Sequence, residues 1–360
     1  MSDITHTSKK SYRPVAIWLY IGVFMLVIQI VLGGITRLTE SGLSITEWDP
    51  ITGVMPPMNQ QQWQQEFDKY KTTSQFQYIH SDFSLSDFKG IFFWEWLHRN
   101  WARLMGLVFL VGFVYFLVKK KFSKPMILPM AMLFVLGAIQ GAIGWIMVAS
   151  GLVPQRLFVG HVQLATHFIA ALILLSYTFW FALSLSVPKT KMLVNIGLKH
   201  SGLLIVVLLF FQLIFGAFMA GTHAAVAAPT WPTINGQWIP TNMNTISPSW
   251  ENLINNKITI QFVHRLLAYT LFVLIIFWWV FAMRKKDNPL FSKARWYPFF
   301  LVILQVILGI LTVVLSPIGH YIVYFGVIHQ LVAILLLLSI IFILFIVKQK
   351  KIPRVTLLDS

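Results

Sequence analysis

Four histidines occupy matching positions in the two halves of this 360-residue sequence, and their side chains are suited to binding a metal. His98 and His167 lie in the first half, and His264 and His329 lie in the second. Each is inside or beside a long apolar run, where an ionisable side chain is costly and is usually kept for function. A single such histidine is more often a hydrogen-bonded core residue. Two pairs at repeated positions favour metal ligation instead.

The residues in and around each pair limit which metal the pair can bind. No carboxylate or third histidine is placed to complete a tetrahedral site in both halves, which argues against zinc. Two imidazoles on facing helices of a four-helix bundle suit a six-coordinate haem iron. The chain has no cysteine, so thiolate haem ligation, iron–sulfur clusters and disulfides are excluded.

One pair is accompanied by an acid. "EWLHR" places Glu95 three residues before His98, on a neighbouring part of one helix face, whereas "QFVHR" has Gln261 at the equivalent place before His264. A carboxylate there can accept a proton from a group bound by His98, which the amide cannot do. We therefore expect catalysis in the first half. A salt bridge from Glu95 to Arg99, one helical turn on, is the structural alternative.

Arginines beside the histidines are candidates for binding haem propionates. Arg99 and Arg265 directly follow two of the histidines, and Arg37 closes the first apolar run. A guanidinium fork pairs well with carboxylates. The alternative is that these side chains reach to the membrane interface.

Eight apolar runs must position these residues. The chain is 57% apolar and 11% charged, against roughly 25% charged residues in a soluble domain. Each run approaches or exceeds the roughly 20 residues that span a bilayer as a helix, so we predict an all-α integral membrane protein. No cleavage site follows the first run, which we expect to be retained. The runs are 15–35, 101–118, 126–148, 160–186, 201–220, 260–282, 297–316 and 322–347.

The distribution of basic residues predicts the topology. The net charge is +16, but 19 of the 28 Lys and Arg fall before the first run, after the last, or in alternate connections. This positive-inside pattern argues against nucleic-acid binding and places both termini in the cytoplasm, with loops 36–93 and 221–257 outside. Only fourteen residues precede the first run, too few for a mitochondrial transit sequence, so we expect a bacterial inner membrane protein.

The whole chain is an internal repeat. Two copies of a four-helix unit are predicted, residues 1–187 and 200–360, joined by a cytoplasmic linker at 188–199. Because each copy has an even number of helices, the copies share one orientation and form pseudo-symmetric parallel bundles. The matched pairs are Gln29-x3-Gly33 with Gln212-x3-Gly216, Gln140-x3-Gly144 with Gln305-x3-Gly309, and Trp48 with Trp231. A glycine in each motif lets the backbone approach something flat and large.

Several segments resemble the haem A synthase family: "GGITRLTESGLSITEW", "EWLHRNWARLMG", "GWIMVASGL", "TWPTINGQWIP" and "QFVHRLLAY". The resemblance runs from about residue 15 to 347. It implies a membrane oxidoreductase that converts a methyl group of haem O to the formyl group of haem A for the terminal oxidase. It further implies that His264 and His329 ligate haem b, that His98 and His167 hold the substrate haem O, and that Glu95 is essential.

The resemblance has two departures and leaves questions open. Some members carry a cysteine pair in the first outer loop, which this chain lacks, and Val226 stands where we expect an arginine. Contacts with a haem O synthase and with oxidase assembly factors, and homo-oligomer formation, are further expectations. The electron acceptor is not identified. His161, His223 and His320 have no assigned role, and His6, His80 and His200 are expected to face solvent.

Two other classes of protein compete with this interpretation. A di-haem b electron-transfer cytochrome also needs paired histidines, but it does not need an acid in only one half. A transporter is often built from repeated bundles, but its site typically lies near the middle of the membrane. The polar positions here all fall in the outer part of the predicted helices. Residues 59–70 have the pattern of a short interfacial helix in the first outer loop, and plain loop structure is the alternative.

Overall fold

The computed structural model describes residues 12–47, 52–286 and 288–349. In these residues eight helical segments are long and apolar enough to cross a membrane, which confirms the predicted fold class. Trp48 and both chain termini lie outside the described residues. The eight segments are α1 (Arg13–Leu38), α4 (Leu85–Val118), α5 (Lys124–Ala149), α6 (His161–Ser186), α7 (Ile196–Gly221), α10 (Lys257–Met283), α11 (Pro289–Ala294) with α12 (Trp296–Val314), and α13 (Gly319–Ile346).

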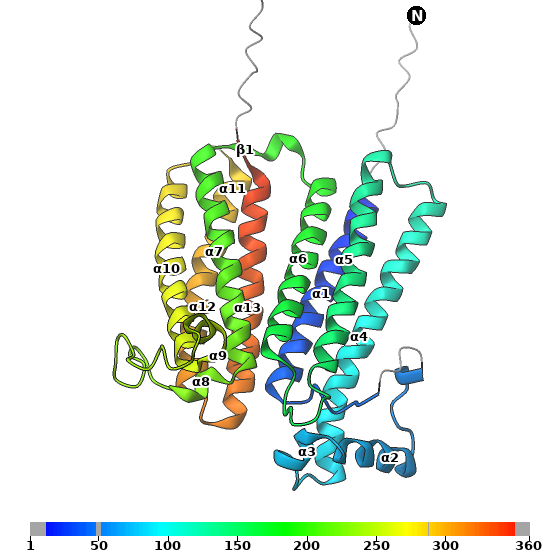
Figure 1. Ribbon diagram of the computed structural model, residues 1–360. Helices are drawn as coiled ribbons and strands as arrows, with labels where there is room; N and C mark the ends of the chain where they lie inside the picture. Colours follow the sequence, from blue (N-terminus) through cyan, green and yellow to red (C-terminus); the bar gives the residue numbers. More distant parts are fainter. Residues whose placement is uncertain (1–11, 48–51, 287, 350–360) are drawn as a thin grey trace, which may run out of the picture.

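The helices form two bundles side by side (Figure 1). In the first bundle α1 packs on α4 and α6, and α5 packs on α6. The second bundle repeats this arrangement, with α7 packed on α10 and α13, and α12 packed on α13. One difference is that α10 also packs closely on α12. The bundles meet through two equivalent pairs, α1 with α13 and α6 with α7, as expected for a two-fold axis parallel to the helices.

One continuous apolar core joins the bundles. Leu19 of α1, Leu172 of α6, Leu209 of α7 and Ile340 of α13 all belong to it. The inner helices are accordingly the most enclosed. In an 18-residue apolar stretch of α1, half of the stretch is buried, against 6% of the corresponding stretch of α4. The outward faces of the peripheral helices remain apolar, as expected for helices surrounded by lipid.

At one end of the molecule, here termed the loop end, the first long loop folds into a small subdomain. It contains η1 (Thr52–Val54), α2 (Gln60–Lys71) and α3 (Ser74–Tyr78), and α2 confirms that the segment expected near 59–70 is helical. Phe67, Tyr70 and Phe88 form its core. The second bundle contributes α8 (Ala224–Ala227), η3 (Ser249–Glu251) and α9 (Asn252–Asn255) to the same end.

The second membrane helix starts earlier than its apolar run, 101–118, and earlier than the predicted end of the first outer loop at residue 93. Helix α4 begins at Leu85 with a capping box, in which Ser84 and Asp87 satisfy each other's backbone N–H groups. Its first turns pack against α2, outside the expected apolar run. His98 therefore lies well inside a continuous helix and not at its mouth.

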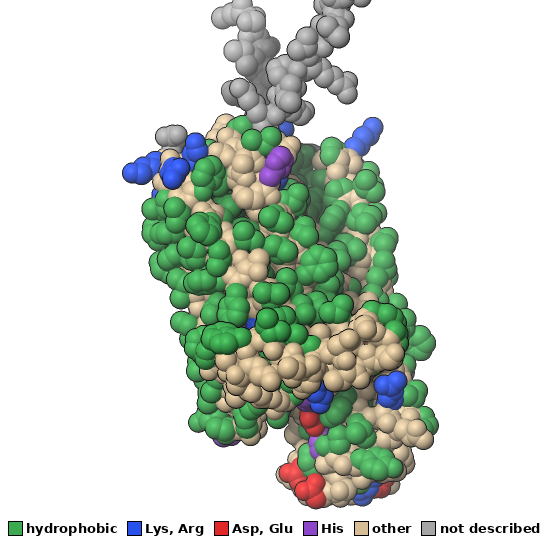
Figure 2. Space-filling model, turned by 60° about the vertical axis from the view of Figure 1, so that its left-hand side comes forward, with side chains coloured by type: hydrophobic (Ala, Val, Ile, Leu, Met, Phe, Trp, Pro, Cys, Tyr) green, Lys and Arg blue, Asp and Glu red, His purple; other side chains and the backbone are tan. Residues whose placement is uncertain are grey.

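The opposite end, here termed the ladder end, carries a two-stranded parallel ladder of β1 (Leu193–Val194) and β2 (Val347–Lys348). The ladder fixes the link between the bundles to the end of α13. The short helix η2 (Lys189–Lys191) precedes β1, and Asn195 caps α7, which begins at Ile196, so the linker ends earlier than predicted. On the face drawn in Figure 2, the Asp and Glu side chains lie at the loop end.

Candidate functional site

Each of the four repeated histidines faces the Gln-x3-Gly motif of a neighbouring helix. In the first bundle the side-chain amide of Gln29, on α1, lies 3.2 Å from Nε2 of His98, on α4. A Cβ atom added to Gly33, one turn after Gln29, would lie 3.1 Å from Cε1 of His98. The glycine therefore lets the imidazole ring pack against the helix backbone.

The same unit recurs three times. The glutamine amide nitrogens lie 3.2 to 3.3 Å from a histidine ring nitrogen, and a glycine Cβ would lie 2.8 to 3.3 Å from the histidine Cε1. The flat group that these glycines admit in the structure is thus the imidazole itself. The units are Gln140 and Gly144 with His167, Gln212 and Gly216 with His264, and Gln305 and Gly309 with His329.

The histidine pairs fit the haem that the sequence suggested. In each bundle the two histidine-bearing helices pack on a shared neighbour: α4 and α6 both pack on α1, and α10 and α13 both pack on α7. Nδ1 of His264 and of His329 is buried without a protein partner, as is Oε1 of all four motif glutamines. Buried polar atoms without partners are rare in proteins and call for a ligand or water. Among the described residues no group of three or more His, Asp or Glu could hold a metal ion.

Glu95 is buried, with 3% of its surface exposed, and three donors hold its carboxylate. Arg99 donates to Oε1 at 2.6 Å, the Ser44 hydroxyl donates to Oε2 at 2.7 Å, and the Ile45 backbone N–H donates to Oε2 at 2.9 Å. The salt bridge weighed from the sequence is therefore present. The carboxylate also fixes the loop that follows α1 above the turn carrying His98.

The second bundle has a neutral version of this arrangement. Gln261 is fully buried and donates to the Ala228 carbonyl at 3.0 Å. Arg265 donates to the carbonyls of Thr230 and Thr233, at 2.7 and 3.1 Å. Arg99 likewise donates to the Ile45 carbonyl at 3.0 Å. Both arginines thus hold the outer loop of their own bundle, and their pairing with propionates stays a prediction.

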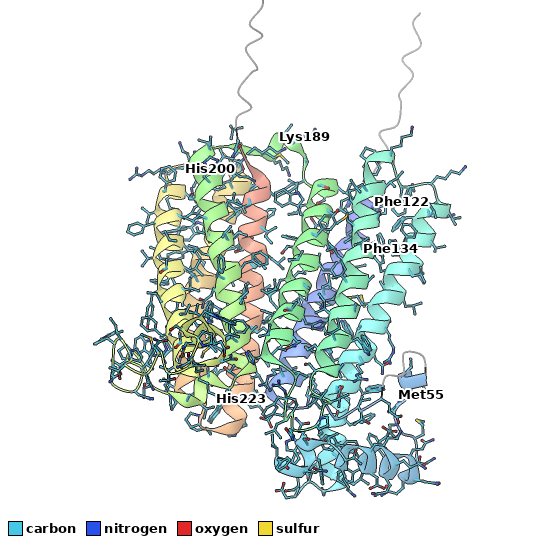
Figure 3. The ribbon with its side chains drawn as sticks, viewed as in Figure 1. Met55, Phe122, Phe134, Lys189, His200 and His223 are labelled. Atoms are coloured by element: carbon cyan, nitrogen blue, oxygen red, sulfur yellow. The ribbon has the colours of Figure 1, made fainter. Side chains whose placement is uncertain are left out.

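Arg37 joins the two bundles. Its guanidinium donates to the Gly221 carbonyl at 3.1 Å and contacts the His223 ring, while its Nε is buried without a partner. His223 lies 3.3 Å from Glu40, and Figure 3 shows it at the loop end where the bundles meet. The contacts with His223 and His80, together with the charge of Arg37, lower the pKa of Glu40 to about 2. This group of residues is a charged link across the bundle interface.

Two of these residues were not recognised from the sequence. His80 was expected to face solvent, but it is buried and its Nδ1 is hydrogen-bonded to the Tyr70 hydroxyl at 2.7 Å, so that prediction is wrong. His223 is displaced from Glu40 by the same 183 residues that separate Gln212 from Gln29. The two interacting residues are therefore repeat equivalents facing each other near the two-fold axis. The shared offset of 183 residues was the feature of the sequence that could have paired His223 with Glu40.

The remaining histidines lie apart from the paired sites. His161 begins α6 and packs edge-on against Phe218 of α7 at 6.0 Å, in the bundle interface. His320 stacks beside Tyr321 at the start of α13. His200 is exposed, as expected, and His6 lies outside the described residues.

The fold and the repeated histidines define a duplicated eight-helix membrane protein with a bis-histidine arrangement in each half. Residues 16–341 match the COX15-CtaA profile, described as Cytochrome oxidase assembly protein, and the chain belongs to this family. A protein named Heme A synthase from Rhizobium rhizogenes is 40% identical over 308 residues, covering 85% of this chain and 83% of the relative.

Two further relatives with the same name match over most of their length. The protein from Wolbachia pipientis wMel is 37% identical over 352 residues, covering 97% of both chains. The protein from Flavobacterium psychrophilum is 39% identical over 334 residues, covering 91% of this chain and 96% of the relative. The resemblance stated from short motifs therefore extends across both bundles.

Proposed function

We propose that this chain is a haem A synthase, an oxidoreductase that converts a methyl group of haem O to the formyl group of haem A for a terminal cytochrome oxidase. The relatives' common name and coverage support the activity. The observation that carries the assignment to this site is the repeated histidine unit combined with an acid, Glu95, in one bundle only. An electron-transfer cytochrome has no use for that asymmetry.

The two bundles then have different ligands. We assign haem b to the second bundle, with His264 and His329 as axial ligands, and the substrate haem O to the first, with His98 and His167. The packing supports this division. Helix α10 packs on α12 as well as on α7. Its 18-residue apolar stretch is 22% buried, against 6% for the equivalent helix of the first bundle, α4. A looser bundle suits a ligand that enters and leaves, and a closed one suits a resident cofactor.

Glu95 is the proposed proton acceptor. When water supplies the oxygen, conversion of a methyl to a formyl group releases protons as well as electrons. Glu95 lies one turn from His98 and is buried, so it can accept a proton beside a haem bound there. Arg99, Ser44 and the Ile45 N–H hold the carboxylate in place. Gln261 cannot accept a proton. Haem b, when bound, supplies one-electron transfer.

Arg37, Arg99 and Arg265 remain the proposed partners of haem propionates. All three lie at the loop end, within a turn or two of the histidine units, and Arg37 has a buried Nε without a partner. Arg37 donates to the Gly221 carbonyl through one terminal nitrogen, so its Nε–H can donate to a carboxylate.

The proposed location is the inner membrane of a bacterium, with the ladder end and both termini in the cytoplasm. The basic segments 119–124, 189–199 and 284–295 all lie at the ladder end. Reporter fusions at residues 122 and 240 test this: the first should report cytoplasm and the second periplasm. Self-association and contacts with haem O synthase and oxidase assembly factors are further proposals.

Pigment extraction from the purified protein tests the function. Detergent-solubilised chain from cells that make haem O should yield haem b together with haem O or haem A. Added haem O should then be converted to haem A under oxidising conditions. Haem b alone, with no conversion, would favour the electron-transfer cytochrome, and absence of haem would contradict both interpretations.

A further inference from the structure

A cavity of about 250 Å³ lies at the ladder end, where α6, α13 and the link between the bundles meet. Three lysines from three different elements line it: Lys189 of η2, Lys199 of α7 and Lys348 of β2. Figure 3 shows Lys189 on the link, at the ladder end. The β1–β2 ladder holds this link against the end of α13, so the lysines are brought together by the fold and not by a flexible tail.

Among the residues that the structure describes, no acid lies beside the lysines of this cavity. None of the lining residues is acidic. Every Asp and Glu that the structure describes lies at the loop end, on the other side of the membrane helices: Glu40, Glu47, Glu66, Asp68, Asp82, Asp87, Glu95 and Glu251. Lys199 donates to the Leu344 carbonyl at 2.6 Å and lies 5.5 Å from the Trp180 ring centroid, which directs its ammonium group inward.

The other wall of the cavity is apolar. Trp180 and Phe345 pack edge-on with ring centroids 5.0 Å apart, and Trp180 is 42% exposed. Both lie in the last turns of membrane helices, at the level where headgroups meet acyl chains. The Ser184 hydroxyl also lines the wall and donates to the Phe181 carbonyl at 2.7 Å. The cavity therefore combines cationic donors on its aqueous side with an aromatic surface on its lipid side.

We propose that this cavity binds the phosphate of an anionic phospholipid, with an acyl chain lying along Trp180. The volume equals that of roughly eight water molecules, which accommodates a phosphate diester and a small alcohol. Basic pockets between membrane helices on the cytoplasmic side are suited to such headgroups. The bound lipid would close the ladder end of the interface between α6 and α13. A free phosphate ion satisfies the same lysines, but it does not use the aromatic wall.

Lipid titration followed by native mass spectrometry of the full chain in detergent tests the proposal. Phosphatidylglycerol is compared with phosphatidylcholine and with inorganic phosphate. The test variant is Lys189→Gln with Lys348→Gln, which leaves the inward-bound Lys199 intact. The control is Lys119→Gln with Lys120→Gln, which removes the same charge from another connection at the same end.

Each lysine near an anionic headgroup is worth about a five-fold change in affinity, so the test pair should weaken phosphatidylglycerol binding by about thirty-fold. The control pair should leave the tightest phosphatidylglycerol site unchanged. Equal losses in the two variants would show a diffuse surface effect and overturn the proposal. Binding of inorganic phosphate as tight as that of phosphatidylglycerol would overturn the lipid assignment. Lys199→Gln, checked for folding by its thermal unfolding midpoint, should lose the site as well.

Discussion

The contact between Gly144 and His167 offers a sharp test of the histidine units, because the same helix supplies a matched control. A Cβ atom at Gly144 would lie 2.8 Å from Cε1 of His167, so the imidazole or the helix must shift in Gly144→Ala. At Gly141, one turn earlier on α5, a Cβ atom would meet nothing within 4 Å. Both substitutions gain the same helix propensity, about 1 kcal/mol. The difference between the two variants therefore isolates the overlap with the histidine.

Overpacking of this kind typically costs about 1–3 kcal/mol. If this free-energy cost opposes haem O binding, haem O should bind Gly144→Ala roughly five to 150 times more weakly than Gly141→Ala, taking ~1.4 kcal/mol per factor of ten. The assay is an absorbance titration of haem O into purified variants, with haem b content as an internal standard. Haem b should stay near the wild-type level in both variants. Equal haem O affinities would show that the ring does not need the glycine, and would refute the idea that the motif exists to seat the histidine.

The remaining predictions concern the haem ligands and the charged link. His264→Ala or His329→Ala should abolish or convert the low-spin haem b spectrum, whereas His98→Ala should preserve that spectrum and lose activity; an unchanged spectrum in both second-bundle variants would exclude those ligands. The Glu40 pKa is lowered from 4.5 to about 2, so its contribution to stability is complete above about pH 4.5 and is lost as pH falls towards 2. The thermal unfolding midpoint of Glu40→Gln should therefore fall less than that of the wild type as pH is lowered from about 4.5 towards 2. Equal falls in the two proteins would count against the charged link.

The long-range plan of the molecule could be predicted from the sequence because its signals are local. Apolar runs of membrane length specify helices. The Gln-x3-Gly and histidine positions recur in the same order in both halves, which predicted the two bundles and the four candidate histidines. These features require no knowledge of which surfaces come together.

The errors arose where tertiary contacts decide the structure. The first turns of α4 are polar enough to end an apolar run, but they are stabilised by the capping box at Ser84 and by packing on α2. His80 appears in a polar loop and is buried only because Tyr70 and Glu40 enclose it. The ladder pairs Leu193 with Val347, residues that no local pattern associates. The guanidinium contacts of Arg99 with loop carbonyls likewise depend on how the loop folds.

The most direct test of the central claim is the conversion of haem O by Glu95→Gln. This substitution makes the first bundle resemble the second, where Gln261 occupies the same place, and the Gln side-chain oxygen can still accept from Ser44 and from the Ile45 N–H. Purified Glu95→Gln should retain haem b and bind haem O, yet form almost no haem A in a timed conversion assay. Haem A formation near the wild-type rate would show that the carboxylate only holds the loop and Arg99, and would contradict its role as the proton acceptor.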